Sequence, residues 1–118
     1  MAQLVVRDGD LVLRLTALEK AEALHGDLRV PLTAVRGVDV LDRAIAAVDG
    51  WRSPGTGVPG LLAVGTYRRG GPRTFAVVHL GTHGGVRVRL GGVEHEQWVV
   101  GCSDPEAVAR DLRAALAP

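Results

Sequence analysis

Hydrophobic and polar positions alternate most clearly in the second half of the chain. Val86, Val88 and Leu90 alternate with Arg87 and Arg89, the period-two pattern of a strand with one buried face. Glycine-rich turns separate three further apolar runs in the same region. We therefore expect four successive strands, at residues 61–68, 73–80, 86–90 and 97–102.

The first half begins with a hairpin and a capped helix. Asp8-Gly9 is a dipeptide typical of two-residue turns, so it predicts a hairpin between strands at 3–7 and 10–16. Thr16 is followed three residues later by Glu19, the spacing of a capping box. This pair predicts a short helix at residues 17–25.

Residues 28–60 contain extended, helical and loop signals in turn. We expect residues 28–41 to be extended with a break, because Val30 precedes Pro31 and therefore favours β geometry. Residues 32–34 are expected to form a bulge or single turn before 35–41, and the whole segment is counted as one long kinked strand. Asp42 is expected to cap a second short helix at 43–49. Residues 50–60 are dense in glycine and proline, so they are expected to form a loop.

The last segment predicts an amphipathic helix near 104–117. Asp104 is a good capping residue, and Pro105 is favoured at the first helical position. One apolar stripe follows at helical spacing, made of Val108, Leu112, Ala115 and Leu116. We expect this stripe to face the core.

These elements predict one mainly β (α+β) domain over residues 1–118, a length that suits a single core. If 28–41 is one strand, the chain has seven strands followed by a closing helix. Short antiparallel strands in this order favour a partly open barrel or sandwich. The C-terminal helix is expected to cap one end of it.

Five short segments carry a family resemblance: Gly9-Asp10-Leu11, Val30-Pro31-Leu32-Thr33-Ala34-Val35, Arg52-Ser53-Pro54-Gly55-Thr56-Gly57, Gly65-Thr66-Tyr67 and Asp104-Pro105-Glu106. With the order of elements, they make nearly the whole chain resemble the pleckstrin homology-like (PH-like) fold. More narrowly, it resembles the small stand-alone PH-like proteins of actinobacteria. The resemblance implies a binding or assembly module without a cofactor. Phosphoinositide-binding PH domains carry clustered basic residues at the first hairpin loop, where this chain has acidic Asp8-Gly9.

Charge is segregated along the chain although the net charge is only +1. No acidic residue lies between Asp49 and Glu94, and that window contains Arg52, Arg68, Arg69, Arg73, Arg87 and Arg89. These arginines predict a basic outer face that binds an acidic protein partner. Peripheral binding to an anionic membrane surface is an alternative, and a solvated face balanced by acids elsewhere is another.

Two further surface features bear on partners. An exposed strand edge of an open barrel favours peptide binding or self-association. Trp51, in the expected loop, is a candidate exposed anchor for a partner. Nucleic acid is not expected, because the net charge is small and the chain has only four large aromatic side chains.

Catalytic and metal chemistry have weaker signals. His79, His83 and His95, with Glu94 and Glu96, are a candidate zinc set, but they fall on different strands and turns. Cys102 offers the only thiol nucleophile, and a free cysteine is usually a small buried hydrophobe. We therefore expect a non-catalytic protein without a metal, and keep a small metal-binding protein or enzyme as the alternative.

The chain start bears on location. It lacks the basic residues and apolar run of a signal peptide. No apolar run has the length of a membrane span. We expect a cytoplasmic protein, with peripheral attachment at the inner membrane surface as the alternative.

Overall fold

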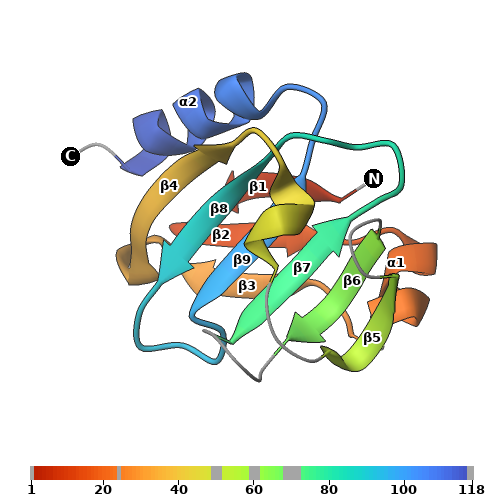
Figure 1. The fold of residues 1–118 in the computed structure, drawn as a ribbon. Coiled ribbons are helices and arrows are strands. Elements are labelled where there is room, and N and C mark those ends of the chain that lie inside the picture. Colours follow the sequence, from red (N-terminus) through yellow and green to blue (C-terminus); the bar gives the residue numbers. More distant parts are fainter. Residues whose placement is uncertain (1, 24, 49–51, 59–61, 68–72, 117–118) are drawn as a thin grey trace.

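Two β-sheets pack face to face in the computed structural model, which describes residues 2–23, 25–48, 52–58, 62–67 and 73–116. The smaller sheet has the order β1-β2-β3, with β1 Gln3–Arg7, β2 Asp10–Arg14 and β3 Leu28–Pro31. The larger sheet has the order β4-β8-β9-β7-β6-β5 (Figure 1). Its strands are β4 Val35–Leu41, β5 Arg52–Val58, β6 Leu62–Tyr67, β7 Thr74–Val78, β8 Gly85–Leu90 and β9 Gln97–Gly101.

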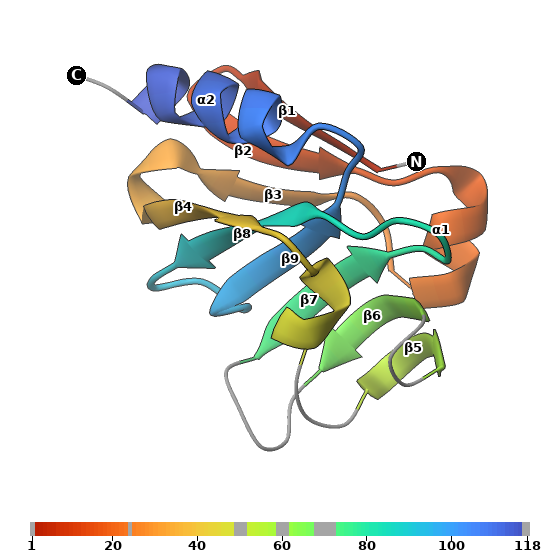
Figure 2. The ribbon, with the colours of Figure 1, turned by 45° about the horizontal axis from the view of Figure 1, so that its top comes forward.

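Helical segments connect and cover the sheets. Helix α1 spans Ala17–Ala23, helix α2 spans Pro105–Leu116, and two 3-10 turns are η1 Leu32–Ala34 and η2 Ala44–Ala47. Figure 2 shows α2 lying across the two layers, and it contacts β1, β4 and β8. Within the described ranges, no helix is long and apolar enough to cross a membrane.

The local signals at the first hairpin and the two α-helices are confirmed. Asp8 and Gly9 both have positive φ, 53° and 78°, as a type I′ turn requires. Thr16 Oγ1 accepts the N–H of Glu19 at 3.2 Å, and Glu19 Oε1 accepts the N–H of Thr16 at 2.8 Å, which closes the capping box. Asp104 Oδ1 accepts the N–H of Ala107 at 3.2 Å, which caps α2.

Two expectations about residues 28–60 are wrong. The turn expected at 32–34 is confirmed as η1, but it redirects the chain, so β3 and β4 lie in different sheets and are not one kinked strand. Residues 52–58 form strand β5 instead of a loop. Proline is tolerated there because β5 is an edge strand and its register shifts between Arg52 and Gly55. The chain therefore has more than the expected seven strands.

The expected all-antiparallel pairing is also wrong. β7 and β9 run parallel, with Phe75 opposite Trp98 and Val77 opposite Val100. β9 is inserted between β7 and β8, so the strands are not ordered as successive hairpins. The expected helix at 43–49 is reduced to the 3-10 turn η2, and its N-cap is Arg43, with no side-chain cap bond, instead of Asp42.

The larger sheet is covered on both faces. The main core lies between the sheets and under α2, and Trp98 and Phe75 are its largest fully buried side chains. A second core on the other face lies beneath η2, which contacts β8 and β9 (Figure 1). This cluster comprises Ala44, Ala63, Tyr67, Ala76, Val78 and Val99. Every residue of β7 and β9 is therefore buried, as in strands covered on both faces.

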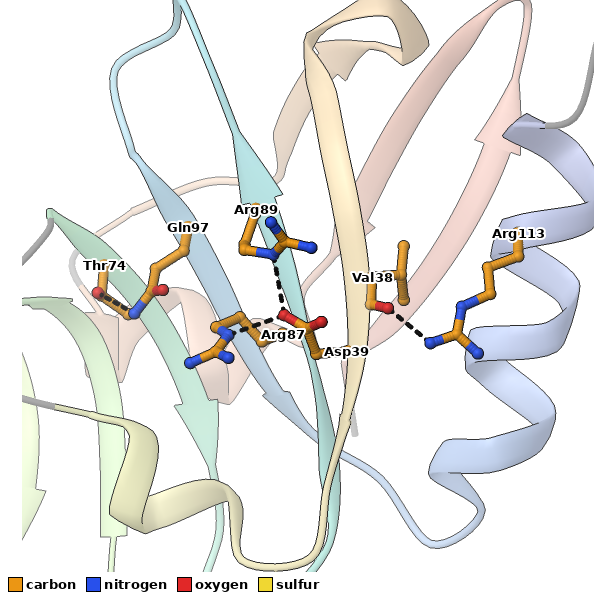
Figure 3. A network of polar contacts seen from close by, with 7 residues as sticks. All are labelled: Val38, Asp39, Thr74, Arg87, Arg89, Gln97 and Arg113. Atoms are coloured by element: carbon orange, nitrogen blue, oxygen red, sulfur yellow. Dashed lines mark hydrogen bonds and ion pairs between the residues drawn. The ribbon is translucent and has the colours of Figure 1, made fainter.

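Helix α2 buries a slightly different stripe from the expected one. Ala109 and Leu112 are buried, and Val108 and Leu116 pack against the main core. Ala115 faces solvent, so its assignment to the stripe is wrong. Arg113 Nη2 donates a hydrogen bond to the carbonyl oxygen of Val38 at 2.7 Å, which joins α2 to β4 (Figure 3).

The close approach of η2 to the sheet predicts that Gly85→Ala destabilises the fold. A Cβ at residue 85 would clash with the carbonyl oxygen of Val100 and lie 2.8 Å from Ala44 Cβ. We expect the free energy of unfolding to fall by about 1–3 kcal/mol, the usual cost of overpacking. Urea unfolding measures it.

Gly26→Ala is the matched control, because an added Cβ there meets nothing within 4 Å. Its free energy of unfolding should stay equal or rise by about 0.4–1 kcal/mol. Equal stability of the two variants would contradict the tight contact between η2 and the sheet.

Candidate functional site

Two of the arginines expected on a basic face share one carboxylate. Arg87 and Arg89, both on β8, donate from Nε to Asp39 Oδ2 on β4 at 3.1 and 3.0 Å (Figure 3). Burial by itself would raise the pKa of Asp39, but the hydrogen bonds and charges of the two guanidinium groups outweigh it and lower this pKa. The positive charge of this pair is therefore partly neutralised within the fold.

The remaining expected site residues are dispersed or undescribed. Arg73 Nε lies 3.9 Å from Glu96 Oε1, which also accepts the backbone N–H of Arg73. Trp51, Arg68 and Arg69 lie outside the described residues, as does the side chain of Arg52. No continuous basic face can therefore be traced from these six arginines.

The candidate zinc residues have separate partners. His79 Nε2 donates to Glu19 Oε2 at 2.5 Å, whereas His95 Nε2 lies 3.3 Å from Thr66 Oγ1. In the described part of the chain, no three His, Cys, Asp or Glu side chains gather where they could hold a metal ion. The carbonyl oxygen of His83 accepts the N–H of Ala44, so this residue anchors η2.

Glu19 has a structural role beyond its capping box. Its side chain is buried, and its second oxygen accepts the N–H of Ala2 at 3.1 Å as well as the hydrogen bond from His79. One carboxylate thus joins the start of β1, helix α1 and the end of β7. Burial would raise the pKa of Glu19, but hydrogen bonds from Thr16 and His79 more than offset it and lower that pKa.

Cys102 packs against the main core and is half-buried. Burial raises the pKa of its thiol, and the negative charge of the nearby Asp104 carboxylate raises this pKa further by a smaller amount. A raised pKa disfavours the thiolate, which is the nucleophilic form. Cys102 therefore has the environment of a packing residue.

A basic hollow that sequence reasoning missed lies on the outer face of the β1-β2-β3 sheet. It encloses about 420 Å³ and is lined by Val5, Arg7, Val12, Arg14, Asp27 and Arg29. Val5 lies opposite Val12, and Val12 lies opposite Arg29, so the register brings these side chains onto one face. We call this surface the basic sheet face.

The arginines of this face differ in their partners. Arg29 Nε donates to Asp10 Oδ2 at 2.5 Å. Arg7 and Arg14 form no ion pair with any described residue. The sequence contained a signal for this face, because Val5 and Arg7, like Val12 and Arg14, are two residues apart. Each pair therefore projects from one side of its strand.

No family model, curated protein or solved structure matches this chain. Its function is therefore inferred from its own geometry and charge.

The buried carboxylate of Glu19 predicts a pH-dependent contribution to stability. Because folding lowers its pKa from the ordinary value of 4.5, this contribution is present above about pH 4.5 and is lost as pH falls through the folded pKa. Glu19→Gln should lower the free energy of unfolding at neutral pH by about 1–3 kcal/mol. Urea unfolding across acid and neutral pH should show the two proteins converging in acid.

Glu106→Gln is the control for this experiment, because Glu106 is an exposed residue in the first turn of α2. It should change stability by less than about 1 kcal/mol. A Glu19→Gln deficit that stays constant from neutral to acid pH would show that the charge of Glu19 does not stabilise the fold.

Proposed function

We propose that this chain is a non-catalytic PH-like interaction module that binds an acidic protein segment through its basic sheet face. The observation that carries the proposal is the hollow in which Arg7 and Arg14 flank the half-buried Val5 and Val12 and form no ion pair within the described ranges. Two stacked sheets with a C-terminal helix agree with the PH-like part of this proposal, whereas the parallel pairing of β7 and β9 departs from the expected antiparallel barrel.

The chemistry of the hollow matches a specific kind of segment. Guanidinium groups bind carboxylates through two parallel hydrogen bonds, and arginine is frequent among the residues that dominate binding energy. The valines provide an apolar floor where one aliphatic side chain of the partner can lose its water shell. The face therefore suits a segment in which Asp or Glu residues alternate with aliphatic residues.

Neutralisation of Arg87 and Arg89 by an acid of the fold favours the basic sheet face over the face that the sequence predicted around these two arginines. Asp39 already lies between Arg87 and Arg89, so an incoming carboxylate there would compete with an acid of the fold. Arg7 and Arg14 form no ion pair with a described residue, although Asp10 holds Arg29 and Asp27 also lines the hollow. An acidic segment is therefore attracted more strongly to the basic sheet face of the smaller sheet than to Arg87 and Arg89 on the larger sheet.

The shape of the surface favours a protein over a membrane. A concave hollow accepts a protruding side chain, whereas a lipid surface is best met by a flat or convex basic patch. Membrane binding is consequently the competing outcome of the test below.

Charge reversal at Arg7 and Arg14 should strongly weaken this interaction. We expect Arg7→Glu/Arg14→Glu to weaken binding of a fluorescent peptide of alternating glutamate and leucine by roughly tenfold or more, because two attractions become repulsions. Fluorescence polarisation at low and high salt measures the affinity. Binding to the unchanged protein should weaken as salt rises.

Two comparisons make this test specific. Arg87→Glu/Arg89→Glu carries the same charge change on the larger sheet and should bind the peptide with nearly unchanged affinity. A glutamate–serine peptide should bind more weakly than the glutamate–leucine peptide, because it cannot fill the apolar floor. The basic sheet face would be rejected as a protein-binding site if both double variants lost peptide affinity equally. It would also be rejected if the unchanged protein bound phosphatidylserine vesicles but not the peptide.

A further inference from the structure

A second hollow follows the outer edge of β1, an edge strand of the smaller sheet (Figure 2). It encloses about 250 Å³ and touches four successive residues, from Ala2 to Val5. Successive side chains of a strand point to opposite faces, so a hollow that touches all four lies along the strand edge. Its opposite wall is apolar and consists of Val100, Cys102 and Val108. We call this hollow the edge groove.

The backbone of β1 has unused hydrogen-bonding groups at this edge. The two-residue turn makes Arg7 and Asp10 a hydrogen-bonded pair, and such pairs alternate with non-bonded pairs along an antiparallel ladder. Leu4 and Val6 therefore occupy non-bonded pairs, and their N–H and C=O groups point away from β2. Among the described residues, no other hydrogen bond to these groups is found. An extended segment can pair with them as an added strand.

The two sides of β1 favour different side chains on an added strand. On the outer side, Val5 and Arg7 belong to the basic sheet face, and Val5 lines the edge groove as well. On the inner side, Leu4 packs against the main core, and Val6 is 42% exposed. Every second side chain of an added strand would thus lie beside the basic sheet face, and the others would lie over apolar groups.

We propose that the acidic segment binds as an added antiparallel strand on the edge of β1. This inference rests on the proposed function and specifies how the segment is held. Its main chain bonds to the N–H and C=O groups of Leu4 and Val6. An aliphatic residue opposite Leu4 enters the edge groove, and one opposite Val6 covers that exposed side chain.

The outer side chains of the same segment meet the basic sheet face. The residue between the two inner aliphatic residues lies opposite Val5, at the valine floor. The residues on either side of it lie opposite Arg7 and Gln3, and Gln3 is itself paired with Arg14. Carboxylates at these two positions complement the arginines. The segment therefore narrows to two acidic residues that flank three aliphatic ones.

A fluorescent peptide of the sequence glutamate–leucine–valine–leucine–glutamate tests the main-chain pairing. Both leucines bond to β1 in this register, whereas the N–H of the valine points to solvent. N-Methylation of the two leucines should weaken binding to the unchanged protein roughly tenfold or more, because two hydrogen bonds are lost. N-Methylation of the valine is the matched control and should leave the affinity nearly unchanged.

Substitutions in the protein and the peptide test the edge groove. Val108→Phe fills the groove and should weaken peptide binding, and serine in place of both leucines should do the same. Ala115→Phe adds a ring at an exposed position of the same helix and should bind normally. Thermal unfolding of both variants separates a loss of binding from a loss of fold.

Hydrogen exchange measured by NMR reports on the β1 edge directly. In the protein without peptide, the N–H groups of Leu4 and Val6 should exchange faster than that of Val5, which bonds to Val12. The peptide should slow exchange at Leu4 and Val6. Unchanged exchange at both residues in the bound state would overturn the strand addition.

The outcomes separate the strand addition from the proposed function. Weaker binding to Arg7→Glu/Arg14→Glu, with equal affinity for the two methylated peptides, would overturn the strand addition and retain the basic sheet face. Affinity that charge reversal does not change would reject the proposed function instead. A complete lack of peptide binding would reject both. A dimer of the unchanged protein that is lost in Val108→Phe would assign the edge to a second copy and overturn the proposal.

Discussion

Burial of both faces of β7 and β9 is the constraint on which the rest of the structure depends. These strands consist mainly of valine, alanine and two large aromatic residues, and they have no solvated side. One face requires the smaller sheet and α2, and the other requires η2. Since the chain has few large rings, the layers must approach closely, and Gly85, beside Ala44 of η2, leaves no room for a Cβ. The two sheets, the connecting turn η2 and the terminal helix are thus consequences of one central pair of strands.

Such close packing makes each buried polar group important. Thr74 Oγ1 accepts a hydrogen bond from Gln97 Nε2 at 2.9 Å across the parallel pair (Figure 3). Thr66 contacts His95. The carboxylate of Glu19 accepts hydrogen bonds from Ala2, Thr16 and His79, which belong to three different parts of the fold. Against this background, the indole N–H of Trp98 is an exception, because it has no hydrogen-bond partner among the described residues.

Signals confined to neighbouring residues were predictable from the sequence. Three such features depend on a few adjacent groups and form as expected: the Asp8-Gly9 turn, the Thr16–Glu19 capping box and the Asp104 cap. Pairing between distant segments was not predictable. Nothing local indicates that β9 inserts between β7 and β8, or that an edge position allows a strand through the glycine and proline of residues 52–58.

The candidate site illustrates the same limit. A window without acids indicated a basic face around Arg87 and Arg89, yet Asp39, 48 residues before Arg87, lies against both. Charge along a sequence does not report charge in space. Conversely, Arg7 and Arg14 come from a region rich in acids and still have no ion-pair partner within the described ranges. Only the register of β1 and β2 shows that they share a face with two valines.

The placement of β9 also constrains the order in which the chain can fold during synthesis. β9 is made after both β7 and β8, but it lies between them in the larger sheet. Until residues 97–101 leave the ribosome, β7 and β8 each lack a neighbour and present an unpaired hydrogen-bonding edge. Unpaired edges promote aggregation, and pairing across distant segments is slow. The nascent protein is thus vulnerable until β9 has been made, and a chain shortened before β9 would keep both edges open permanently.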